Sequence, residues 1–142
     1  MAGPQTITIT LYVDTQNITL ANTDQYCNFG QDVTKISNCD YTVEAEPGDL
    51  IVWQAIPKPA TTDTVKILAI WGRTNRPDRR RSDYVMGEFI RNQDGDRSVA
   101  ARVVGKQRQI QSYKLFFMVS KNGVPSGIYF IDPKIAIKPS AR

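Results

Sequence analysis

Arginine is the chemically versatile residue type that this sequence concentrates most strongly in one place. The segment RTNRPDRRRSD (residues 73–83) is followed directly by Tyr84, and its five arginines are Arg73, Arg76, Arg79, Arg80 and Arg81. A guanidinium group stays charged and offers paired donors that fit phosphate or carboxylate oxygens. The segment has no apolar side chain except that of Pro77, so we expect an Arg-rich surface loop. These arginines and Tyr84 are therefore the candidate contacts to a ligand or to a second copy of the chain.

The sequence contains no histidine. This excludes Ser-His-Asp and Cys-His nucleophile arrangements, the usual zinc sets and the blue-copper centre of cupredoxins, which a small sandwich carrying the strand EPGDLIVW would otherwise suggest. No G-x-S-x-G nucleophile elbow and no glycine-rich phosphate loop occurs. We therefore expect a protein that is not an enzyme, with no cofactor and no metal site.

Two groups of carboxylates have spacings that would suit acid/base catalysis or the binding of a metal ion. Glu44 and Glu46 would share one face of a strand, where we expect them to face solvent rather than to act as an acid/base pair. Asp94-Gly95-Asp96 has two acidic oxygen donors close together, but it lacks the further ligands of a calcium loop. We interpret this second group as a turn.

The elements that would position these residues are short strands. TITITLYV (Thr6–Val13) alternates apolar and polar residues, the period of a strand with one buried face. Alternation or short apolar runs predict further strands at 41–45, 50–56, 64–71, 84–90, 99–104, 113–120 and 127–138, the last with an edge or bulge at Pro133. Turn residues separate them at 47–49, 92–96 and 122–123.

No stretch holds helical spacing, so about eight strands favour an all-β, two-sheet antiparallel β-sandwich, immunoglobulin-like or cupredoxin-like in outline. We expect residues 1–142 to form one domain with a long loop at about 22–38 and the Arg-rich loop at about 73–83. The aromatic residues that fall inside strand patterns are expected in the core, which counts against a nucleic-acid-binding face; they are Trp53, Trp71, Phe116 and Phe117.

The N-terminal residues lack both the basic opening and the apolar block of a secretory signal, and no apolar run approaches the 20 or so residues that cross a bilayer. We expect a cytoplasmic protein without membrane contact. Cys27 and Cys39 are then expected to be reduced, although pairing would be open to them in an oxidising compartment.

Four segments carry a family resemblance in their order and spacing. They are ITLYVDTQNI (Ile9–Ile18), VEAEPGDLIVWQAI (Val43–Ile56), DTVKILAIWG (Asp63–Gly72) and GIYFIDPKIAIKP (Gly127–Pro139). Together they resemble the PixA/AidA family of bacterial inclusion-body proteins. The resemblance implies a cytoplasmic β-sandwich that accumulates in dense or crystalline inclusions, and it supplies no catalytic residues.

Three functions are consistent with these observations. The first is a non-enzymatic, self-associating homo-oligomer of the PixA/AidA kind, in which strand edges and the basic loop make the contacts. The second is a lectin-like module that binds a carbohydrate or an anionic ligand through the Arg-rich loop. The third, nucleic-acid binding, rests on charge alone, because the net charge is +4 and the basic residues gather between Arg73 and Arg108.

Overall fold

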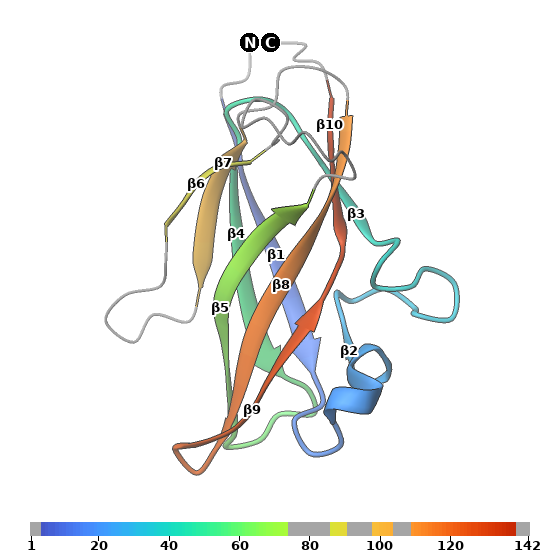
Figure 1. Ribbon diagram of the computed structural model, residues 1–142, viewed down its shortest axis with the longest axis vertical. Helices are drawn as coiled ribbons and strands as arrows, with labels where there is room; N and C mark the ends of the chain where they lie inside the picture. The colour runs from blue at the N-terminus through green and yellow to red at the C-terminus, as the bar shows by residue number, and fades with distance from the viewer. Residues whose placement is uncertain (1–3, 74–85, 91–97, 104–108, 139–142) are drawn as a thin grey trace.

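Strands in two layers make up most of the described part of the protein (Figure 1). The computed structural model describes residues 4–73, 86–90, 98–103 and 109–138. The elements within these ranges are β1 (Thr6–Val13), the 3₁₀ helix η1 (Leu20–Gln25), β2 (Cys27–Asn28), β3 (Thr42–Ala45), β4 (Leu50–Pro57), β5 (Thr64–Arg73), β6 (Met86–Ile90), β7 (Val99–Val103), β8 (Gln109–Lys121), β9 (Val124–Ile131) and β10 (Lys134–Ile137).

The predicted all-β, two-sheet sandwich is confirmed, and its sheets are mixed rather than wholly antiparallel. One sheet has the order β2-β1-β4-β7-β6, and the other has the order β3-β10-β8-β5 with β9 also paired to β8. The pairs β1–β4 and β3–β10 are parallel. Alternation within a strand does not reveal its direction. Here β1 and β4 run the same way because the intervening chain passes through β3 in the opposite sheet.

The strand count differs from the expected eight in two places. The two-residue β2 is too short to produce an alternation signal. The predicted strand over 127–138 is divided at Pro133, which has no N–H to donate. Both resulting strands, β9 and β10, still run antiparallel to β8, and the Pro133 carbonyl accepts a hydrogen bond from the Tyr113 N–H at 3.0 Å.

Two predicted turns connect paired strands. The sequence predicts a hairpin around 92–96, and β6 and β7 do pair antiparallel, although residues 91–97 lie outside the described residues. At the other turn, Asn122 and Gly123 have φ angles of 52° and 78° between β8 and β9. Positive φ at both central residues is the requirement of a type I′ hairpin turn, which explains the Asn-Gly pair.

The hydrophobic core lies between the sheets, where inward-facing residues from both layers form a single cluster. At its centre Trp53 of β4 and Tyr113 of β8 are both 0% exposed. The Trp53 indole Nε1–H donates to the Tyr113 hydroxyl at 3.0 Å, and the rings meet edge to face. This hydrogen bond satisfies two polar groups that would otherwise be costly to bury, and it links the sheets.

The predicted loop at 22–38 contains most of η1 and all of β2, and a buried polar side chain, Asn38, makes hydrogen bonds across it. The Asn38 Nδ2 group donates to the Cys27 carbonyl at 2.9 Å, and its Oδ1 accepts a hydrogen bond from Gln31 at 3.0 Å. Asn38 is 2% exposed, so these hydrogen bonds take the place of those that its amide group would make to water. They hold together a segment that has few apolar side chains to bury. No helix in the described ranges is long and apolar enough to span a membrane.

Candidate functional site

The arginine residues singled out in the sequence lie almost entirely outside the described ranges. Arg73 is the last residue of β5, where its backbone pairs with Ser112 of β8. The others, Arg76, Arg79, Arg80, Arg81 and Tyr84, are outside the described residues. Their role in ligand binding or in contacts between copies stays a prediction.

The described part of β5 contains an irregularity that changes which side chains reach the surface. Val65 and Ile67 face the core, as their alternation predicts. A β-bulge at Leu68 then shifts the register, because Ile67 pairs with Phe117 and Ala69 pairs with its neighbour Phe116. One extra residue in a strand sends the following side chains to the opposite face. Trp71 is therefore 62% exposed, and the expectation that it lies in the core is wrong.

Phe116 is the second aromatic residue that leaves the core. It is adjacent to Phe117 in β8, and neighbouring residues of a strand point to opposite faces. Phe117 is fully buried, as is Trp53, which confirms two of the four expected core aromatics. Phe116 lies half-buried on the outer face, so its predicted place in the core is also wrong.

Three rings form a continuous row across the outer face of β5, β8 and β9, which we call the aromatic ridge: Trp71, Phe116 and Phe130. The ring centroids of Trp71 and Phe116 are 5.3 Å apart with the planes at 64°, and those of Phe116 and Phe130 are 5.7 Å apart at 40°. The Lys114 Nζ lies 4.8 Å from the centroid of the Phe130 ring. These are the distances of favourable aromatic and cation–π contacts.

The ridge offers apolar and π contacts to a partner. Phe130 is 48% exposed and its strand neighbour Ile128 is 56% exposed. Sequence reasoning missed Phe130, Ile128 and Lys114, although the alternation around the buried Tyr129 and Ile131 places Phe130 on the outer face. A contiguous apolar patch on a sheet surface is typical of a binding or assembly site.

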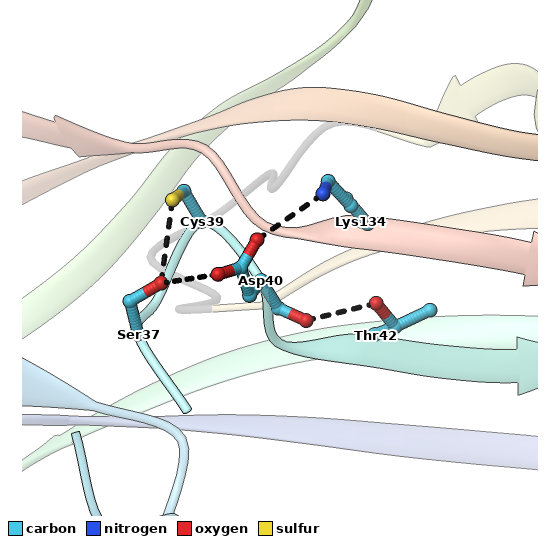
Figure 2. Close-up of polar contacts among 5 residues, drawn as sticks. All are labelled: Ser37, Cys39, Asp40, Thr42 and Lys134. Carbon is cyan, nitrogen blue, oxygen red and sulfur yellow. Dashed lines mark hydrogen bonds and ion pairs between the residues drawn. The ribbon is translucent and has the colours of Figure 1, made fainter. Parts of the chain in front are cut away.

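A second group of polar side chains lies where β3 and β10 begin (Figure 2). The Ser37 hydroxyl donates to one Asp40 carboxylate oxygen at 3.1 Å and lies 3.3 Å from the Cys39 sulfur. Lys134 donates to the other Asp40 oxygen at 3.3 Å, and the Thr42 hydroxyl donates to the Asp40 carbonyl at 3.0 Å. Asp40 thus ties the loop before β3 to the start of β10. We interpret the group as a structural contact that holds the loop in place.

The two cysteines are both free and differ in environment. Cys27 is buried, and its thiol donates to the Thr23 carbonyl at 3.1 Å. Burial, with a smaller contribution from the Asp24 carboxylate, raises the pKa of the Cys27 thiol to about 12. A thiol with such a pKa stays protonated and is a poor nucleophile at neutral pH. Cys39 is exposed.

Of the two carboxylate groups singled out in the sequence, the structure describes Glu44 and Glu46. Glu44 faces solvent, as expected, and forms an ion pair with Lys138 at 2.6 Å, while Glu46 lies just beyond the end of β3. Hydrogen bonding and attraction from Glu44 raise the pKa of Lys138. Among the described residues no three His, Cys, Asp or Glu side chains are grouped to hold a metal ion. Asp94 and Asp96 lie outside those residues.

Comparisons with known proteins identify the fold. No model of a known family matches the chain, and no curated protein matches it significantly. The solved structures that match include an inclusion body protein, PixA, from Burkholderia cenocepacia, with a TM-score of 0.63 and 13% identity over 96% of this chain and 98% of that one. A cysteine protease inhibitor from Entamoeba histolytica gives a TM-score of 0.40 with 10% identity over 97% and 100%. The expected resemblance to the PixA/AidA family is confirmed at the level of the fold: this chain has the fold of the Burkholderia inclusion body protein.

Proposed function

We propose that the chain is a non-enzymatic, self-associating cytoplasmic protein of the PixA/AidA inclusion-body kind. The observation that carries the proposal is the similarity of fold to the Burkholderia inclusion body protein over 96% of this chain. That protein is an inclusion body protein. Self-association is the physical property that formation of an inclusion requires.

Sequence resemblance and fold support the proposal by separate routes. The four segments that carry the resemblance fall on the framework of the sandwich, because they include most of β1, β3, β4, β5 and β9 and all of β10. The absence of histidine from the whole sequence supports the non-enzymatic part, since it removes the commonest catalytic base.

Sedimentation equilibrium of the full chain, from micromolar to near-millimolar concentration and at low and high salt, tests self-association. We expect the average mass to rise with concentration to that of a dimer or larger assembly. In a companion experiment the chain is expressed in a bacterial cytoplasm and the cells are imaged for dense inclusions. We expect such inclusions to form, and to release on dilution soluble protein with the circular dichroism spectrum of the folded chain. A strict monomer at every concentration and salt would contradict the proposal.

A further inference from the structure

The aromatic ridge and the adjoining Ile128 together expose more apolar surface than scattered single residues would. Trp71, Ile128 and Phe130 are 62%, 56% and 48% exposed. With about 150–250 Å² for a whole aromatic side chain, their exposed parts amount to roughly 300–400 Å². This is the size of the largest apolar patch on a typical monomer, which is often functional. It is also close to half of the ~800 Å² that each partner contributes to a stable protein–protein interface.

The composition of the ridge fits the centre of such an interface. Interface centres are enriched in aromatic residues and methionine and depleted in charge. Met118 lies beside Ile128 in the β8–β9 ladder, and Lys66 and Lys114 stand at the margin of the rings. The ridge also extends to β5, which pairs only with β8 among the described strands and so ends its sheet.

Charges on the same face favour a protein over a nucleic acid. Two lysines of this face form ion pairs with carboxylates: Lys134 in β10 with Asp40, and Lys138 directly after β10 with Glu44. A face that binds a single-stranded nucleic acid needs a row of cations along the backbone beside its stacking rings. The lysines of and after β10 are neutralised here, and the rings themselves are flanked by the aliphatic side chains of Met118 and Ile128 and by Lys66 and Lys114, of which Lys114 lies against the Phe130 ring. These two lysines do not make such a row.

We propose that the aromatic ridge is the surface through which one copy of this chain packs against a second copy, sheet face against sheet face. The inference rests on the proposed self-association and names its contact. In a two-fold contact the same patch serves on both copies, so the exposed Trp71 and Phe130 rings of one copy are covered by apolar and aromatic surface of the other. Edge-to-face packing of rings, as Trp71 and Phe116 already show within one copy, would continue across the interface.

The test compares sedimentation equilibrium of the wild-type chain with Trp71→Ser and Phe130→Ser. The matched control is Ile56→Ser, because Ile56 is 43% exposed on the outer face of the other sheet. Circular dichroism melts establish that each variant is folded; if one is not, the other provides the same test. We expect each ridge substitution to raise the dissociation constant by roughly tenfold or more, as for an aromatic hot-spot residue. The control should leave the dissociation constant unchanged.

The outcomes separate the ridge from the proposed function. If both folded ridge variants associate as tightly as the wild type, the ridge is not the contact, although self-association stands. If the wild type is monomeric throughout, both proposals fail. A titration with labelled oligothymidylate covers the other occupant: binding that Trp71→Ser abolishes, with association unchanged, would assign the ridge to nucleic acid and overturn the inference.

Discussion

The hydrogen bond between Trp53 and Tyr113 provides a sharp test of how the two sheets are held together. Tyr113→Phe removes one oxygen atom from the centre of the core and leaves the packing of the ring unchanged. The Trp53 N–H, which is 0% exposed, then loses its acceptor. Leaving a buried donor unsatisfied costs about 1–3 kcal/mol, so we expect the free energy of unfolding to fall by about this amount.

Urea unfolding at neutral pH, followed by tryptophan fluorescence and circular dichroism, measures the change. Tyr129→Phe is the matched control, because this buried tyrosine stacks on Phe117 and no hydrogen bond of its hydroxyl to another described residue is found. We expect a change within about 0.5 kcal/mol for the control.

The double variant Trp53→Phe/Tyr113→Phe completes a cycle in which donor and acceptor are both absent. Its cost should be smaller than the sum of the two single costs, because neither polar group is left unsatisfied. A Tyr113→Phe cost below about 0.5 kcal/mol, or strictly additive single costs, would refute the reasoning.

Two other predictions concern buried polar groups. Burial raises the pKa of the Cys27 thiol from 9.0 to about 12 and that of the Tyr113 hydroxyl above its usual 10.0, so the unfolded chain loses these protons first and stability should fall as the pH rises above 9. In urea titrations across this range Cys27→Ala should reduce the slope, and an unchanged slope would contradict the burial of the thiol. Asn38→Ala should cost about 1–3 kcal/mol because it removes the bonds to Cys27 and Gln31. Hydrogen exchange should then accelerate in residues 26–41, and protection equal to that of the wild type would count against Asn38 as the organising residue.

Local patterning was sufficient to predict the strands and the two-layer class. β1 has the predicted bounds, and the pair β6–β7 and the Asn122-Gly123 turn lie where apolar alternation and turn residues indicate. These features depend on neighbours in the sequence. The parallel pairing of β1 with β4 depends instead on the path of the chain through the other sheet, which alternation does not encode.

The ridge could be predicted only in part. The adjacent Phe116 and Phe117 cannot both face the core from one strand, so the sequence already required one of them to be exposed. Trp71 is different, because its exposure depends on the bulge at Leu68. The apolar alternation of the sequence continues through this residue, but the strand pairing shifts by one position there and turns Trp71 to the outer face. The Arg-rich loop was evident from composition, yet its arginines after Arg73 lie outside the described residues.

The environment of Trp71 during assembly tests the central claim most directly. The chain has two tryptophans, so Trp53→Phe leaves Trp71 as the single fluorophore of this kind. Acrylamide quenching of this variant, measured across a dilution series alongside sedimentation, reports whether Trp71 is covered when copies associate. We predict strong quenching of the monomer and progressively weaker quenching, with a blue-shifted emission, as the mass rises. Quenching that stays constant while the mass rises would contradict assembly through the aromatic ridge.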